Sequence, residues 1–197
     1  MMKQQKGRMK NYKIILASNS PRRKELLAGL DVEFEVKVLP GIDESYPDNL
    51  PVEKIPQYIA QEKAEAYRNL IDEETLVITA DTVVVLGDEI LGKPKDDEDA
   101  CRMLRELSGK THQVITGVCL TTLRKQKRFA VTTNVTFKVF TDDEINYYVS
   151  HYHPLDKAGA YGIQEWIGHI GVTALNGSYF NVMGLPVQRI YSEMQRF

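Results

Sequence analysis

Short apolar runs separated by polar turns predict that the first part of the chain alternates between buried strands and helices. Residues 12–18 form an apolar run that predicts a strand. A helix should follow at once, because Ser20 is a good cap, Pro21 suits the first helical position and Gly29 can end the helix. Residues 33–39 predict a second strand.

The middle of the chain carries the strongest periodicity. Residues 51–70 have apolar positions at helical spacing, which predicts one long amphipathic helix. Its expected buried face carries Ile55, Ile59, Ala66 and Leu70. Residues 75–86 are almost continuously apolar, as is typical of a strand buried on both faces. Gly87 and Asp88 then predict a turn into a hairpin partner at 89–91.

The second half of the chain adds helices and two long strands. We expect a helix from the Asp96 cap to Leu107, strands at 112–123 and 128–140, a helix from a Thr141–Glu144 capping box to about His151, a strand near Ile170, and a last helix from about Pro186. Strands and helices mix without strict βαβ alternation. The pattern therefore predicts an α/β fold with a mixed, twisted sheet and flanking helices.

Length, composition and charge exclude several classes of protein. The 197 residues suit a single domain at 12–197, preceded by a polar, basic and flexible extension at 1–11. A net charge of −2 gives no support for binding a nucleic acid polymer, and no apolar run approaches the ~20 residues of a membrane span. Cys101 and Cys119 follow no secretory segment, so we expect reduced thiols in the cytoplasm.

Four polar side chains gather where the first strand meets the first helix. Ser18, Ser20, Arg22 and Arg23 surround a helix N-terminus, which carries unpaired N–H groups and a partial positive charge. Arginine binds phosphate oxygens in a bidentate manner, so this segment could hold a phosphate group. The alternative is a capped surface helix with solvated arginines, and these residues alone leave both readings open.

Asp81 interrupts the apolar run at 75–86. A carboxylate at this position is unfavourable unless it is paired or binds a metal ion. Since side chains alternate along a strand, Thr79 should share its face and Thr82 should lie on the other. A role in metal binding or as a general base is favoured over the capping of a nearby turn.

Three more charged residues could complete such a site. Glu44 follows Asp43 in a loop and could add an oxygen ligand, although an acidic pair in a loop is usually solvated. Lys63 lies on the apolar stripe of its helix, where it either reaches solvent or points a cation into a cleft. Lys93 has the spacing of a P-loop lysine, but Pro94 replaces the required Ser or Thr, so we reject that motif.

Six blocks of sequence occur together and in a fixed order. They are Leu16–Leu27 (LASNSPRRKELL), Ala80–Thr82 (ADT), Gly92–Pro94 (GKP), Ser108–Gln113 (SGKTHQ), Asp156–Gln164 (DKAGAYGIQ) and Gly184–Pro186 (GLP). The set resembles the Maf family of nucleotide pyrophosphatases along the whole chain from about residue 12. The resemblance implies an elongated, two-lobed fold with a central cleft, similar to inosine triphosphate pyrophosphatases and often homodimeric.

The resemblance also implies an activity and roles for individual residues. The reaction is hydrolysis of a nucleoside triphosphate to the monophosphate and pyrophosphate with a divalent metal, Mg²⁺, Mn²⁺ or Co²⁺. Asp81 corresponds to the general base and a metal ligand, with Glu44 as its partner at the metal. The phosphate-contacting set corresponds to Ser18, Arg22, Arg23, Lys63 and Lys93.

The segment that ends at Gln164, with Arg23 and Thr82, resembles the branch of the family that acts on dTTP and UTP rather than 7-methyl-GTP. A glutamine amide offers a donor beside an acceptor, which complements O4 and N3–H of uracil or thymine. A flipped amide would suit cytosine, so Gln164 alone leaves the base open. Modified pyrimidine triphosphates are a further alternative, and so is a non-catalytic nucleotide-binding regulator of cell division.

Overall fold

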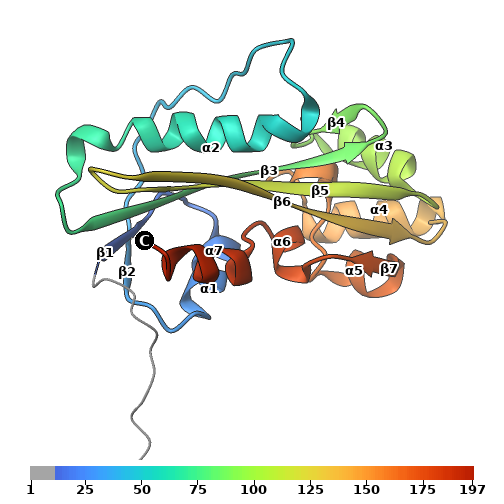
Figure 1. The fold of residues 1–197 in the computed structure, drawn as a ribbon. Coiled ribbons are helices and arrows are strands. Elements are labelled where there is room, and N and C mark those ends of the chain that lie inside the picture. The colour runs from blue at the N-terminus through green and yellow to red at the C-terminus, as the bar shows by residue number, and fades with distance from the viewer. Residues whose placement is uncertain (1–11) are drawn as a thin grey trace, which may run out of the picture.

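The computed structural model of the protein describes residues 12–197, and the extension expected at 1–11 lies outside them. The described residues form an elongated α/β fold with one mixed, seven-stranded sheet (Figure 1). Its strands are β1 (Lys13–Leu16), β2 (Phe34–Val36), β3 (Thr75–Leu86), β4 (Glu89–Leu91), β5 (Thr111–Thr121), β6 (Gln126–Phe137) and β7 (Val172–Asn176). The strand order is β2-β1-β3-β5-β6-β7, and β4 pairs with β3.

Helices cover both faces of this sheet. They are α1 (Pro21–Ala28), α2 (Ile55–Glu65), α3 (Asp97–Leu107), α4 (Asp142–Tyr152), α5 (Trp166–Gly171), α6 (Tyr179–Met183) and α7 (Val187–Met194), with short 3-10 helices η1 (Val52–Lys54), η2 (Arg68–Leu70) and η3 (Ala158–Ala160). Helix α2 packs on β3 and β5, while α1, α6 and α7 lie on the opposite face (Figure 1). Within the described range, none of these helices is long and apolar enough to cross a membrane.

Two large hydrophobic clusters give the molecule its two lobes. One joins α3, α4 and α5 to the neighbouring strands, and the other joins β1, α1 and α7 to the opposite end of the sheet. Strand β3 passes through both, since Ile78 belongs to the second cluster and Val84 to the first. Asp81 and Thr82 therefore lie where one core ends and the next begins. The expected two-lobed α/β fold with a mixed sheet is confirmed.

One edge of β3 is uncovered at this midpoint. Strand β1 runs parallel to β3 only as far as the pair Leu16 and Ile78, and β4 begins to pair at Val84. Within the described chain, residues 79–83 thus have no neighbouring strand on that edge. On the opposite edge, β5 pairs with β3 without a break over Val77–Val85. The gap between β1 and β4 opens a cleft in the middle of the sheet.

The long helix predicted at 51–70 is wrong in its second half. Helix α2 ends at Glu65, and both Ala66 and Leu70 are exposed rather than buried. The chain leaves the helix because Tyr67 turns into the protein, where it is 1% exposed and its hydroxyl donates to the Lys37 carbonyl at 2.8 Å. This contact fixes the chain that follows β2.

The expected strand near Ile170 is displaced. Ile170 lies in α5, and β7 starts at Val172. The residues of α5 form a helical turn because Gly168 packs directly against the backbone of Ile163. A Cβ atom at position 168 would overlap that backbone. Helix α6, capped by Ser178, was not predicted, and its five residues are too few to show a period.

The turn between the two long strands is also shifted, since β5 ends at 121 and β6 runs over 126–137. The predicted caps are confirmed: the Ser20 hydroxyl accepts from the Arg23 N–H, and Thr141 and Glu144 form a capping box.

Gly117 provides a test of how α2 is placed. It lies opposite Asp81 in the β3–β5 register, and a Cβ at this position would come within 3.0 Å of backbone atoms of Pro56 and Gln57. We expect G117A to lower the free energy of unfolding by about 3 kcal/mol or more, because backbone atoms cannot move aside as side chains do. Urea denaturation measures this change. G92A is the control, since its new methyl group meets open space and should change stability by under about 0.5 kcal/mol. A G117A protein as stable as the wild type would contradict the packing described.

Candidate active site

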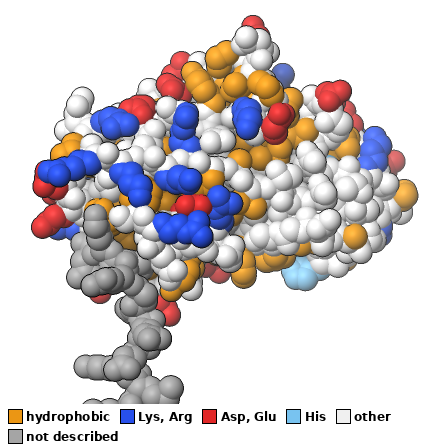
Figure 2. Space-filling view, viewed as in Figure 1, with side chains coloured by type: hydrophobic (Ala, Val, Ile, Leu, Met, Phe, Trp, Pro, Cys, Tyr) orange, Lys and Arg blue, Asp and Glu red, His pale blue; other side chains and the backbone are white. Residues whose placement is uncertain are grey.

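A cavity of about 780 Å³ opens at the uncovered edge of β3. Every site residue predicted from the sequence lines it: Ser18, Arg22, Arg23, Glu44, Lys63, Asp81, Thr82, Lys93 and Gln164. Lys and Arg side chains gather on the half of the molecule that contains β1 and α1 (Figure 2). The cavity therefore joins residues spread along the chain into one site with a cationic surrounding.

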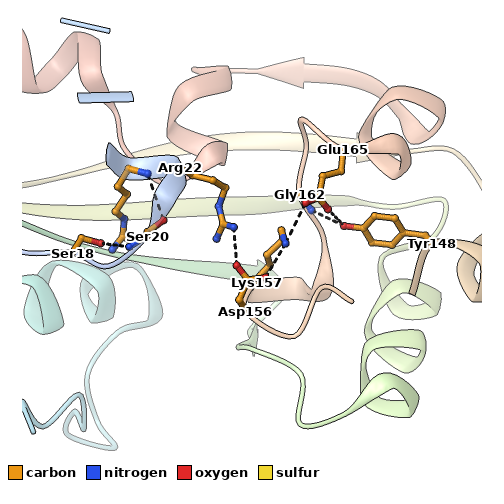
Figure 3. Close-up of polar contacts among 9 residues, drawn as sticks. Ser18, Ser20, Arg22, Tyr148, Asp156, Lys157, Gly162 and Glu165 are labelled. Carbon is orange, nitrogen blue, oxygen red and sulfur yellow. Dashed lines mark hydrogen bonds and ion pairs between the residues drawn. The ribbon is translucent and has the colours of Figure 1, made fainter. Parts of the chain in front are cut away.

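The N-terminus of α1 forms one wall of the cavity. The Ser18 hydroxyl accepts a hydrogen bond from the Ser20 N–H at 3.2 Å, and the Ser20 hydroxyl accepts one from the Arg23 N–H at 3.4 Å. Arg22 extends from the same turn and donates to the Asp156 carboxylate at 2.8 Å (Figure 3). Both serines thus fix the helix start, and Arg22 remains beside the opening with 24% of its side chain exposed.

Arg23 points into the protein. Its guanidinium donates to the carbonyls of Gly184 and Ala80, both at 2.8 Å, and to the Thr82 hydroxyl at 3.1 Å. Burial lowers the pKa of Arg23, while the charge of nearby Asp81 acts in the opposite direction. The Ala80 carbonyl lies on the uncovered edge of β3. Arg23 therefore gives it the hydrogen bond that a neighbouring strand would otherwise provide.

Asp81 and Glu44 share one cation, the ammonium group of Lys63. The Lys63 nitrogen lies 3.0 Å from an oxygen of each carboxylate. Asp81 and Lys63 are largely buried, with side chains 15% and 14% exposed, whereas Glu44 is 57% exposed. The neighbouring Asp43 instead accepts two hydrogen bonds from Ser45. Only one acid of the loop therefore faces the cavity.

The donor set around this ammonium suits a hard cation. Two carboxylates already converge on one positive charge, and oxygen ligands of this kind are preferred by Mg²⁺ and similar ions. Across residues 12–197, no group of three or more His, Cys, Asp or Glu side chains is arranged to hold a metal ion. Asp81 and Glu44 could thus supply two ligands, and the remainder would come from substrate phosphates and water.

The two faces of β3 carry different chemistry, as the alternation of its side chains predicted. Thr79 donates to the Ala60 carbonyl at 2.6 Å, so it faces α2 together with Asp81. Thr82 lies on the other face, 2.9 Å from the Thr116 hydroxyl. Arg23 and Asp81 thus approach the middle of β3 from opposite sides.

Gln164 also lines the cavity, and its side-chain amide has an acceptor that is unpaired among residues 12–197. Within the described chain, the Gln164 side-chain oxygen is buried and has no hydrogen-bond partner. Tyr161 lines the same cavity, and its hydroxyl lies 2.7 Å from the His112 Nε2 atom. Lys93 contributes a cation from the segment after β4. An unpaired amide oxygen beside a cavity is suited to accept an N–H from a ligand.

Sequence reasoning missed two charged residues of this site, Asp156 and Lys157. Lys157 is 8% exposed, and its ammonium contacts Asp156 at 2.8 Å and Glu165 at 3.2 Å. Burial raises the pKa of Asp156, but hydrogen bonds from Lys157 and Arg22 outweigh it and lower the value to about 2. The sequence offered one signal for these two residues, since the charged pair stands directly before a Gly- and Ala-rich segment.

Known proteins similar to this chain match almost all of it. Residues 13–197 match the family model described as Maf-like protein. A Phocaeicola vulgatus protein named dTTP/UTP pyrophosphatase is 62% identical over 188 residues, which is 95% of this chain and 97% of the relative. A Bacteroides thetaiotaomicron protein of the same name is 56% identical over 190 residues, or 96% and 98% of the two chains.

Among solved structures, the Staphylococcus aureus Ham1 protein superposes with a TM-score of 0.53. The two chains are 18% identical, and the match covers 93% of this chain and 98% of the other. At this identity the similarity shows a common fold, in agreement with the α/β fold predicted from the sequence.

Buried His112 should make stability depend on pH. Burial lowers its pKa from 6.5 to about 4, so the unfolded state binds more protons between these values. The contribution of His112 is then complete above pH 6.5 and is lost as the pH falls towards 4. We expect urea denaturation to show that the wild type loses about 3 kcal/mol more than H112Q between pH 7 and 4. H151Q, which changes an exposed histidine, should keep the wild-type pH dependence. Equal slopes for H112Q and the wild type would contradict this assignment.

Proposed function

Because this chain belongs to the Maf family, we propose that it hydrolyses dTTP and UTP to the nucleoside monophosphate and pyrophosphate. The observation that carries the proposal is that Asp81, Lys63 and the start of α1 all line one cavity, where acids and cations lie within reach of a single ligand. The relatives named dTTP/UTP pyrophosphatase match over almost their whole length, which supports the same reaction.

The triphosphate would lie between α1 and Lys93. Ser18 and the N–H groups at the start of α1 would hold phosphate oxygens, and Arg22 would exchange its contact with Asp156 for one with phosphate. Lys63 and Lys93 would stabilise the negative charge that grows on the leaving pyrophosphate. Arg23 has three donors bound to the protein, so its proposed contribution is to hold Thr82 and the edge of β3 in place.

Asp81 is the proposed general base. It would take a proton from the water that attacks the α-phosphorus, and the bond between the α-phosphorus and its bridging oxygen would break as pyrophosphate leaves in line. Asp81 and Glu44 would also hold a divalent cation, Mg²⁺, Mn²⁺ or Co²⁺, which supplies charge neutralisation at the phosphate oxygens when bound. Their shared contact with the Lys63 ammonium supports this pairing.

The base would lie at the end of the cavity that contains Gln164. Its unpaired side-chain oxygen supports a hydrogen bond from N3–H of uracil or thymine, while the amide NH₂ would donate to O4. A cytoplasmic location and a homodimer belong to the same proposal, and light scattering on the purified protein tests the dimer.

Pyrophosphate release from a panel of nucleoside triphosphates tests the reaction. We expect release from dTTP and UTP with Mg²⁺, Mn²⁺ or Co²⁺, and much slower release from purine triphosphates. Preference for 7-methyl-GTP would keep the chemistry and contradict the role of Gln164. Nucleotide binding without release from any substrate would support a non-catalytic regulator instead.

Asp81 can be tested separately. We expect D81N to lower kcat for dTTP by at least about 10³-fold, because the amide cannot accept the proton from water. The affinity for dTMP should stay within about threefold of the wild type, measured by calorimetry. The matched control is D88N, an exposed position in the turn between β3 and β4 that should retain full activity. A D81N enzyme with most of its activity would contradict the proposed role.

A further inference from the structure

A single buried hydroxyl holds both ends of the turn that carries Gln164. The Tyr148 side chain on α4 is 0% exposed, and its hydroxyl accepts a hydrogen bond from the Gly162 N–H at 3.1 Å. The same hydroxyl donates to the Glu165 carboxylate (Figure 3). A third hydrogen bond, from the Glu165 N–H to the Gly162 carbonyl at 3.0 Å, closes the turn. Gln164 therefore lies inside a loop whose two ends are fixed by one group.

The turn has little room to rearrange. A Cβ at Gly162 would come within 2.9 Å of the Glu165 carboxyl carbon and 3.0 Å of the Gln164 side-chain nitrogen. The adjacent Ile163 is 5% exposed and belongs to the core around α3 and α4. The position of the Gln164 amide is thus determined by its packed neighbours as well as by the hydrogen bonds.

Lys157 supplies the charge that balances Glu165. Its ammonium lies 3.2 Å from the carboxylate oxygen that does not bind Tyr148. The ion pair lies at a largely buried position, where the Glu165 side chain is 21% exposed. Lys157 lines the cavity, whereas neither Tyr148 nor Glu165 occurs among the described residues that do. Any effect of Tyr148 or Glu165 on the ligand is therefore indirect and passes through the turn or, for Glu165, also through its contact with Lys157.

We propose that Tyr148 and Glu165 are positioning residues for pyrimidine selection, which hold the Gln164 amide in the orientation that fits uracil and thymine. The proposal rests on the proposed function, since it assigns the base to the Gln164 end of the cavity. We call the hydrogen bonds of the Tyr148 hydroxyl to Gly162 and Glu165 the clamp. Without the clamp, the turn relaxes and the amide can rotate. An amide that rotates accepts cytosine as readily as uracil, because the two bases present opposite donor and acceptor patterns.

The test compares kcat/KM for UTP and CTP in Y148F. This change removes the hydroxyl and leaves the Gly162 N–H and one Glu165 oxygen without their partner. We expect the UTP to CTP ratio to fall about tenfold, mainly through a higher KM for UTP. The matched control is Y147F, the neighbouring tyrosine of α4, which is 45% exposed and should keep the wild-type ratio. A general loss of folded enzyme would lower both rates equally, so an unchanged ratio in Y148F would overturn the proposal.

Two variants of Glu165 supply an independent arm should Y148F fold poorly. E165Q retains an oxygen that can accept from Tyr148, so its ratio should stay within about threefold of the wild type. E165A has no acceptor, and its ratio should fall about tenfold, as in Y148F. Equal ratios in E165Q and E165A would contradict the clamp.

Binding measurements separate the two proposals. Calorimetry with the α,β-methylene analogues of UTP and CTP reports base selection without turnover. If the wild type releases no pyrophosphate but binds the UTP analogue selectively, and Y148F loses that selectivity, the proposed reaction fails and the clamp stands. If the wild type does not distinguish the two analogues, the clamp is overturned.

Discussion

The architecture depends on a short length of strand edge that is left without a neighbour. Strand β1 stops pairing with β3 at Ile78 and β4 starts at Val84, while β5 continues along the other edge without interruption. Unpaired backbone groups at such an edge must find other partners, and Arg23 donates to one of them at Ala80. Polar side chains can thereby occupy the middle of a sheet, between two apolar cores, and still reach a ligand.

Charge compensation determines what the cavity can contain before a ligand arrives. Asp81 lies in an apolar strand, where an unpaired carboxylate is strongly unfavourable, and the Lys63 ammonium at 3.0 Å neutralises it. Arg22 is likewise paired with Asp156, and Lys157 with Glu165. A phosphate group that binds Lys63 or Arg22 would thus exchange one ion pair for another.

The sequence predicted the features that depend on neighbouring residues. The Ser20 and Thr141 caps, the strand at 75–86 and the exceptional position of Asp81 are all visible in short segments. Features that depend on distant pairing were not predictable in this way. Arg23 binds a carbonyl 161 positions away at Gly184, and the clamp at Tyr148 joins α4 to a loop.

The predictions that were wrong also failed because of contacts between residues distant in the sequence. Ala66 and Leu70 fit the helical period. The helix nevertheless ends before them, because burying Tyr67 and its contact with the segment after β2 is more favourable than another helical turn. The resemblance to a family supplied the site residues that local patterns left open, and the structure brings all of them to one cavity. Asp156 and Lys157 were missed because contacts such as that of Asp156 with Arg22, 134 positions away along the chain, exist only in the folded protein.

The length of strands β3, β5 and β6 affects how the two lobes can move. Each extends over eleven or twelve residues, and β3 contributes side chains to both cores. The lobes are therefore joined by a shared hydrogen-bonded sheet rather than by a linker, and a hinge motion of two rigid bodies would have to bend or break this sheet. The segment at 38–46, which carries Glu44, lines the cavity outside any helix or strand and is not paired with the sheet. The sheet is a continuous frame for the cavity, whereas Glu44 reaches the same cavity from a loop rather than from a helix or strand.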